Sequence, residues 1–411
     1  MTSIESSRWT LATLDKIAHV GAGNPAPQDQ TLFEGGKHPF IRTSDVGQIR
    51  FGEIGTSADL LNEQGASKLR LVPKGTVLMP KSGASTFLNH RVVTTADAFV
   101  SSHLATITPK EGVADPGYLL YALSQVAAQD LLPENSYPSL NLNLIKTIKL
   151  PLPSLEEQQR IVEILDEAFE GLARARDHAE ANLQNARELF ENFLSVKMQA
   201  DSDDWTNYSF GDPNVLKIVD GDRGANYPKK TDFLSKGHCL FLNTKNVRPD
   251  GFDFDETMFI SEERDQLLRK GKLLPRDVLL TTRGTIGNIA IFDNSVPYEH
   301  IRINSGMLIL RPNEDIIRAE FLFELLRSSV IRKQIEEHVS GAAQPQLPIR
   351  SLVKFRLPAP KATDEQLVIV EELKQLSVKV SEMAEGYETK LQDIDDLRQS
   401  LLQNAFAGEL T

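Results

Sequence analysis

The chain has 411 residues, a formal net charge of −12, 40% hydrophobic residues and 25% charged residues, which is typical of a folded protein with room for two or three domains. Its single cysteine, Cys239, excludes an internal disulfide bond and a four-cysteine zinc site, and indicates a reducing, intracellular setting, which we expect to be cytoplasmic. No uncharged apolar run approaches the ~20 residues of a membrane span, so we expect no membrane partner.

The sequence of residues 1–153 predicts a globular domain of short strands and few helices. A strand runs into a polar loop at 40–46, and a turn leads into a buried strand at 73–78. A basic loop with a glycine follows at 81–83, and a further strand is predicted over 100–107. This order of elements favours an α+β fold with mostly antiparallel strands.

A long helix is predicted over 154–200. Apolar or small residues recur there at spacings of three and four, which is typical of a coiled-coil seam, and no proline interrupts the stretch. A helix of about 40 residues is ~60 Å long at ~1.5 Å per residue. The residues that we expect to pair with another helix are Leu165, Leu172, Leu183 and Phe190.

Residues 201–360 repeat the first domain. The block LPLP at 150–153, followed by Gln158, returns as LPAP at 357–360, followed by Gln366. The basic loop at 283–285 is aligned with 81–83, because each contains a cation and a glycine. Between these anchors the copies diverge strongly. A shared frame with variable loops suits a scaffold that carries two specificities.

The final segment, 361–411, predicts a second long helix with the same periodicity. Its expected pairing residues are Leu373, Leu376, Val380, Met383, Tyr387 and Leu391. We expect the two helices to pair antiparallel within one chain and to separate the two similar domains with pseudo-two-fold symmetry. The alternative is two separate coiled-coil segments that each meet a second chain.

The negative charge is concentrated in these two helices. Residues 155–200 contain 10 acidic and 5 basic side chains, and residues 363–411 contain 11 and 4, which accounts for the whole net charge. The globular parts are therefore neutral overall and can carry local basic patches. Acidic helices would bind phosphate poorly and are better suited to a protein partner.

The sequence offers no catalytic constellation. It contains no GxxxxGK[ST] phosphate loop, no HExxH motif and no cluster of histidine with cysteine, so ATP binding by that loop and a metal site are not expected. His103 lies in an apolar predicted strand and is interpreted as a core histidine rather than a catalytic base. By elimination, the sequence indicates a binding or scaffolding role.

Polar and basic loops at matching places in the two domains are the candidates for binding DNA. They combine cations, hydroxyl groups and glycine, which can contact phosphates, while arginine and glutamine side chains can read base edges. In the first domain the candidates are Arg42, Lys68, Arg70, Lys81, Ser82, His90 and Arg91. In the second they are Arg223, Lys229, Lys230, Lys245, Asn246, Thr282, Arg283, Thr285, Arg302, Gln344 and Gln346.

The full pattern resembles the specificity (S) subunit of type I restriction–modification enzymes, the HsdS family. The resemblance spans nearly the whole chain, and it is carried by the paired LPxP–EQ–IV blocks, the loops 283–287 and 344–347, and the terminal block 397–410. The first domain departs from the family pattern, because residues 79–83 replace the usual basic-Gly-Thr loop.

The resemblance implies a non-catalytic reader of double-stranded DNA. Two target-recognition domains, 1–153 and 201–360, would each read one half of a split site in the major groove, and the helices 154–200 and 361–411 would fix the unread spacer. Two methyltransferase (M) subunits and two restriction and translocase (R) subunits would assemble on it. S-adenosylmethionine, ATP and magnesium are then expected on those partners, and no cofactor is expected in this chain.

The residues alone leave another function open. A scaffold without DNA function could use the repeat to bind a symmetric protein partner. A salt-dependent gel shift, with and without methyltransferase, distinguishes the two functions.

Overall fold

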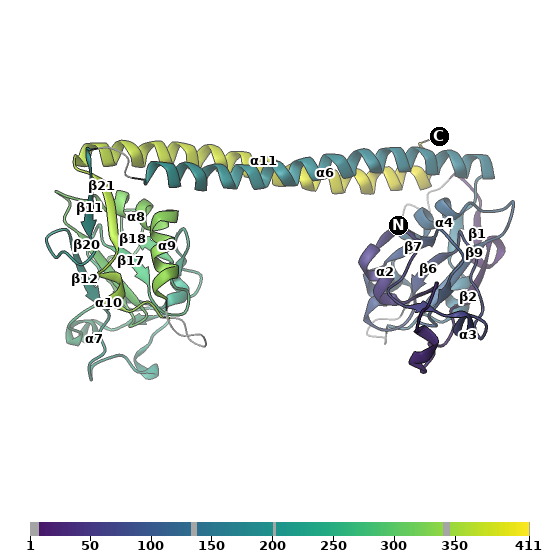
Figure 1. The fold of residues 1–411 in the computed structure, drawn as a ribbon, viewed down its shortest axis with the longest axis horizontal. Coiled ribbons are helices and arrows are strands. Elements are labelled where there is room, and N and C mark those ends of the chain that lie inside the picture. The colour runs from purple at the N-terminus through teal and green to yellow at the C-terminus, as the bar shows by residue number, and fades with distance from the viewer. Residues whose placement is uncertain (1–7, 133–137, 200–202, 340–345, 411) are drawn as a thin grey trace. The chain divides into compact units, whose positions relative to one another are not determined.

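The computed structural model describes residues 8–132, 138–199, 203–339 and 346–410, and the chain divides into two compact units. The first unit is Met1–Ala179 with Thr389–Thr411, and the second is Glu180–Glu388. Each unit holds one α+β globule and one segment of each long helix, α6 (Leu155–Lys197) and α11 (Thr363–Ala407) (Figure 1).

The globule of the first unit is built on two small sheets. The larger has the strand order β2-β9-β6-β7-β4 (Ala18–Ala22, Leu104–Pro109, Val77–Pro80, Arg91–Thr94, Phe51–Ile54). The smaller has the order β5-β3-β8 (Leu60–Leu61, His38–Ile41, Phe99–Val100). A separate antiparallel pair joins β1 (Leu11–Thr13) to β10 (Lys149–Pro151). The helices are α1 (Leu14–Ile17), α2 (Thr43–Ile49), α3 (Glu63–Ala66), α4 (Pro116–Ser124) and α5 (Leu142–Lys146).

The globule of the second unit repeats this plan. Its larger sheet has the order β12-β20-β17-β18 (Leu216–Asp220, Met307–Pro312, Val278–Thr281, Ile289–Ile291), and its smaller sheet the order β16-β13-β19 (Phe259–Ile260, Cys239–Leu242, Ile301–Ile303). Two further pairs are β11-β21 (Trp205–Ser209, Arg356–Pro360) and β14-β15 (Val247–Arg248, Gly251–Phe252). The helices are α7 (Glu262–Leu267), α8 (Ala319–Arg327), α9 (Ser329–His338) and α10 (Ile349–Leu352).

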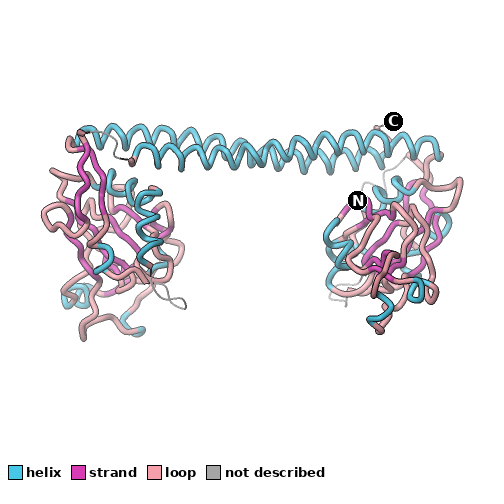
Figure 2. The backbone as a smooth tube through the Cα atoms, viewed as in Figure 1, coloured by secondary structure: helices cyan, strands magenta, loops and turns pink. Residues whose placement is uncertain are grey.

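These sheets confirm the predicted α+β fold, and most strand pairs are antiparallel. The exceptions are the parallel pairs β3-β8, β4-β7 and β13-β19. Short strands alternate with long loops in both globules (Figure 2).

The single strand predicted over 100–107 is wrong. The chain makes a turn after β8, where Leu104 N–H donates to Ser101 O at 3.0 Å, and only then enters β9. The second unit has the same break between β19 and β20. Hydrophobic pattern alone missed the turn, because apolar residues flank it on both sides. One consequence is that His103 belongs to a turn and not to the core.

The repeated glutamine of the EQ block joins each long helix to its globule. Gln158, at the start of α6, is fully buried; its amide nitrogen lies 3.0 Å from both Val113 O and Pro153 O, and its side-chain oxygen accepts from Asp115 N–H at 2.8 Å. A buried amide with all three bonds made is a stable anchor, whereas an unmade bond here would be costly.

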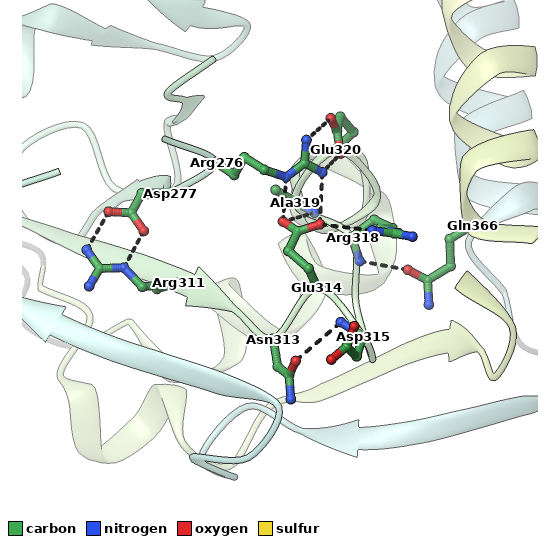
Figure 3. A network of polar contacts seen from close by, with 10 residues as sticks. All are labelled: Arg276, Asp277, Arg311, Asn313, Glu314, Asp315, Arg318, Ala319, Glu320 and Gln366. Carbon is green, nitrogen blue, oxygen red and sulfur yellow. Dashed lines mark hydrogen bonds and ion pairs between the residues drawn. The ribbon is translucent and has the colours of Figure 1, made fainter. Parts of the chain in front are cut away.

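Gln366, at the start of α11, makes the same three contacts in the second unit. Its amide nitrogen lies 2.8 Å from Ile316 O and 2.9 Å from Pro360 O. Arg318 N–H donates to its oxygen at 2.9 Å (Figure 3). The sequence repeat is therefore the signature of a repeated joint between helix and globule.

A network of ion pairs lies beside this second joint. Arg276 binds the carboxylates of Glu314 and Glu320, with its Nε 2.8 Å from Glu314, and Asp277 accepts two hydrogen bonds of 2.7 Å from Arg311 (Figure 3). The two carboxylates raise the pKa of Arg276, first through the hydrogen bond from Glu314. The network ties the start of β17 to the start of α8.

The two long helices pair antiparallel within each unit, which confirms the predicted pair. In the first unit Arg176 of α6 binds Asp395 of α11. In the second unit Arg187 binds Glu388 at 3.0 Å, and Lys197 lies 2.5 Å from Glu372. Lys197 at the end of α6 thus meets Glu372 near the start of α11, as expected for an antiparallel pair.

The expected pairing residues differ in burial. Leu165 joins the core of the first unit, while Phe190, Leu373 and Val380 join the core of the second. Half-buried positions are Leu172, Leu183, Leu376, Tyr387 and Leu391. Met383 is 44% exposed, so it does not lie in the buried seam.

Candidate nucleic-acid interface

In the second unit, an exposed basic loop follows β17. Arg283 is exposed, and its guanidinium group has no hydrogen bond or ion pair within the described residues. The backbone is nevertheless fixed, because Thr282 N–H donates to Gly306 O at 2.8 Å and Arg283 N–H donates to the same oxygen at 3.2 Å. Gly284, with φ of 72°, adopts the left-handed conformation that favours glycine. The loop therefore presents Arg283 from a rigid base.

The glutamine segment lies directly beside this loop. Gln346 forms an antiparallel bridge with Arg283, and Leu347 N–H donates to Thr282 O at 3.0 Å. Thr285 is exposed, and its hydroxyl donates to Thr244 O at 3.3 Å. The structure thus brings together Arg283, Thr285 and Gln346, which the sequence offered as separate candidates. Gln344 lies outside the described residues.

The first unit has the same construction after β6. Ser82 forms an antiparallel bridge with Ser139, Leu140 N–H donates to Lys81 O at 2.8 Å, and Lys81 N–H donates to His103 O at 3.0 Å. Gly83, with φ of 81°, takes the left-handed conformation that Gly284 takes in the second unit. Lys81 and Ser82 are both half-buried.

These contacts correct the alignment of the two loops. The sequence reasoning matched Lys81 with Arg283 because both are cations. The backbone hydrogen bonds and the left-handed glycines instead place Lys81 at Thr282 and Ser82 at Arg283. The first loop therefore has a small hydroxyl side chain where the second has an arginine.

The candidate lysines and arginines of the other loops that are not buried fall into two groups. Four have partners: Arg42 pairs with Asp59, Arg70 donates to Ala22 O, Arg223 lies 3.1 Å from Asp220, and Lys245 lies 3.9 Å from Glu256. Three are exposed and make no ion pair within the described ranges: Lys68, Lys229 and Lys230. The second group is better suited to phosphate contacts, since no ion pair in those ranges holds its ammonium groups.

Four candidates are buried, and the globule itself uses their polar groups. Arg91 donates to His90 O and Val126 O, and Arg302 binds Asp265 and Lys270 O. Asn246 donates to Asp253 O and Glu256 O, and the Thr282 hydroxyl donates to Gly306 O. These side chains hold the frame together and are not presented to a ligand, so we leave them out of the proposed contact set.

His90 lies in a different place from the loop. It lines a cavity of about 540 Å³ between the globule and α11 of the first unit, together with Arg50, Phe51 and Arg398. Burial lowers the pKa of His90, as do the positive charges of Arg50 and Arg91. None of the residues 81–83 lines this cavity.

His103 is the site residue that sequence reasoning missed. It is exposed, and its Nδ1 lies 2.7 Å from the Ser82 hydroxyl. The interpretation as a core histidine is wrong, because the turn before β9 carries the ring to the surface beside the loop. A signal was present in the sequence, since two serines and a histidine in succession at 101–103 are unusual inside a buried strand.

Neither a metal site nor a membrane segment is evident in the part of the chain that the structure describes. Its residues contain no group of three or more histidine, cysteine, aspartate or glutamate side chains placed to hold a metal ion. Among the same residues, every helix is too short or too polar to span a bilayer.

Two similar globules, each with a rigid polar loop and each anchored to a helix pair, define a duplicated binding protein rather than an enzyme with one active site. A family model described as "Type I restriction modification DNA specificity domain" matches residues 6–177 and again residues 202–391. The chain belongs to this family: it is a non-catalytic, DNA-binding specificity subunit of a type I restriction–modification system, with two target-recognition domains.

Similar proteins cover nearly the whole chain. The type I restriction enzyme MjaIX specificity subunit of Methanocaldococcus jannaschii is 21% identical over 98% of this chain and 93% of its own length. The type I restriction enzyme EcoBI specificity subunit of Escherichia coli is 23% identical over 100% of this chain and 88% of its own.

Two solved structures share the fold. One chain comes from the structure described as "Structural basis underlying complex assembly and conformational transition of the type I R-M system", with a TM-score of 0.77, 19% identity and coverage of 98% of both chains. The HsdS subunit from Thermoanaerobacter tengcongensis has a TM-score of 0.64 and 18% identity, and the match covers 98% of this chain and 97% of that one.

Proposed function

We propose that each target-recognition domain reads one half of a split double-stranded DNA site, the first with the loop around Ser82 and the second with the loop around Arg283. The observation that carries this proposal is one backbone frame with different side chains at equivalent positions. Phosphate contacts position a protein on DNA, whereas contacts to base edges specify the sequence. Loops that share a frame but differ in side chains are suited to reading two different half-sites.

The residues proposed to contact DNA follow from exposure and partners. Arg283, Thr285 and Gln346 are proposed to meet base edges or adjacent phosphates in the second half-site, and Lys81 and Ser82 in the first. Exposed cations without ion pairs in the described chain are proposed to contact phosphates: Lys68, Lys229 and Lys230. The paired cations Arg42, Arg70, Arg223 and Lys245, and His90 in its cavity, remain weaker candidates.

The long helices are proposed to serve two purposes. Each is a single uninterrupted element, of 43 residues in α6 and 45 in α11, so together they are suited to fix the length of the unread spacer. Their acidic surfaces are proposed to receive two M subunits, with R subunits joining the assembly. S-adenosylmethionine, ATP and magnesium would be bound by those partners.

The proposed domain boundaries are 1–153 and 201–360 for the target-recognition domains, and 154–200 and 361–411 for the helices. The proposed place of action is the cytoplasm, where chromosomal and invading DNA are both accessible. The single cysteine, Cys239, has no second cysteine in the chain to pair with, which agrees with a reducing compartment.

The test is the variant Arg283→Ala in the complex with the M subunits. We expect discrimination within the second half-site to fall by about 5- to 150-fold, the equivalent of ~1–3 kcal/mol for a bidentate base contact, while the first half-site is read as before. Arg283→Lys is the matched control, since it keeps the charge but loses the planar fork. Binding is measured on DNA altered in one half at a time, and equal losses in both halves would refute the division of labour.

A further inference from the structure

Each unit has one long and one small residue at the two equivalent positions of loop and turn, but the long residue lies in the turn of the first unit and in the loop of the second. Lys81 N–H donates to His103 O at 3.0 Å, and Thr282 N–H donates to Gly306 O at 2.8 Å, so His103 and Gly306 occupy the same turn position. His103 N–H lies 3.4 Å from the Ser101 hydroxyl, and Gly306 N–H lies 2.8 Å from the Asn304 side-chain oxygen. The first unit thus has serine in the loop and histidine in the turn, whereas the second has arginine in the loop and glycine in the turn.

Glycine in the second turn leaves room for the arginine. A Cβ atom added at Gly306 would lie 2.8 Å from the Thr244 methyl group and 3.9 Å from the Cβ of Arg283. The base of the Arg283 side chain therefore lies directly beside Gly306. A larger residue at position 306 would force Thr244 to move and would compete with Arg283 for the same space.

Serine in the first loop makes the reverse arrangement possible. Ser82 has a small side chain, and its hydroxyl lies 2.7 Å from His103 Nδ1. The histidine backbone is held from both sides, because its carbonyl accepts from Lys81 and the turn closes with a 3.0 Å hydrogen bond from Leu104 to Ser101. Within the described residues, His103 Nε2 has no partner. The ring is exposed, oriented and has one nitrogen available.

We propose that His103 is the base-contacting residue of the first target-recognition domain, in the place that Arg283 occupies in the second, and that Ser82 is its positioning residue. This inference rests on the proposed function. When the Ser82 hydroxyl donates to Nδ1, Nε2 carries the proton and donates to an acceptor such as a purine N7. When Nδ1 carries the proton, Nε2 accepts from an exocyclic amino group of adenine or cytosine. Either way the imidazole forms one hydrogen bond, whereas an arginine can form two.

The experiment uses the full chain assembled with its M subunits and DNA with each base pair of both half-sites substituted in turn. We expect His103→Ala to lower discrimination by about tenfold at one base pair of the first half-site and to leave the second half-site unchanged. Ser82→Ala is expected to affect the same base pair less. His19→Ala is the matched control, because His19 is an exposed histidine of the same globule on β2.

A double variant tests the exchange directly. Ser82→Arg combined with His103→Gly copies the arrangement of the second unit, and it is expected to bind DNA with an altered base preference in the first half-site. His103→Gly alone is the control for a folding defect, because the equivalent turn of the second unit has glycine at this position. Thermal unfolding of each variant is measured alongside.

The outcomes separate the inference from the proposed function. Unchanged discrimination in His103→Ala, with Arg283→Ala still impairing the second half-site, would overturn the role of His103 and leave the function standing. A uniform loss at all base pairs would also overturn it, because a phosphate contact or a folding defect affects every sequence alike. Absence of any sequence preference in the unaltered complex would refute the proposed function itself.

Discussion

Substituting Gln366 by alanine is expected to destabilise the second unit by about 3 kcal/mol. The side chain is fully buried and makes three hydrogen bonds, to Ile316 O, Pro360 O and Arg318 N–H. Each contributes roughly 1 kcal/mol, and the backbone groups left without partners in a buried joint add to the loss. Because Arg318 is the N-cap of α8, the first turn of that helix is expected to open more often.

Hydrogen exchange and urea unfolding of the full chain measure this effect. The amide of Arg318 is expected to exchange much faster in Gln366→Ala, and the unfolding midpoint of the second unit is expected to fall. The control is Gln375→Ala on the same helix, where the exposed side chain donates a hydrogen bond to Glu371 at 3.0 Å. Such a contact on a helix surface contributes about 0.3 kcal/mol. Equal effects of the two substitutions would contradict the reasoning that the buried amide anchors the helix.

Three further outcomes are expected. A four-residue insertion in α6 lengthens the helix by about 6 Å. Methylome or binding assays should then show a changed spacer length or no binding, and an unchanged spacer would show that the helices do not determine its length. Arg276→Gly should be about 1 kcal/mol more stable than Arg276→Ala in urea unfolding, because φ at this position is 73° and the alanine keeps that strain; equal stabilities would argue against strain. Burial raises the pKa of Glu324, so its negative charge opposes folding. Glu324→Gln should therefore be more stable than the unaltered chain by an amount that grows as pH rises above the ordinary pKa of 4.5, with no difference below it. A difference that grows on acidification would contradict this sign.

The repeat and the long helices could be predicted from sequence because their signals are local and regular. Spacings of three and four persist along both helices, and proline is absent from them, so the structure's α6 and α11 begin within a few residues of the expected points. The paired EQ blocks revealed the duplication. No local pattern could predict their physical role, because each glutamine bonds to a backbone oxygen more than 40 residues away in the sequence.

The contact residues were harder to predict, because accessibility depends on distant partners. Arg302 looks like any surface cation in the sequence, yet it lies in a buried strand and binds Asp265, 37 residues earlier. Aligning Lys81 with Arg283 by charge also failed, since the shared feature is a backbone turn with a left-handed glycine. His103 is exposed because a turn divides an apolar stretch of the sequence, and periodicity alone does not show such a turn.

Among the residues that the structure describes, the side-chain amides of both glutamine joints bond to main-chain atoms. Gln158 and Gln366 meet two carbonyl oxygens and one amide N–H each, which any residue supplies at the carbonyl positions and any residue except proline supplies at the amide. The three hydrogen bonds of each joint therefore tolerate side-chain changes at their partner positions, whereas Leu165 and Leu373 also belong to the apolar cores of the globules and depend on the side chains there. Exposed loop side chains lie outside both kinds of contact, so a change in what a globule reads can leave its attachment to the helices intact.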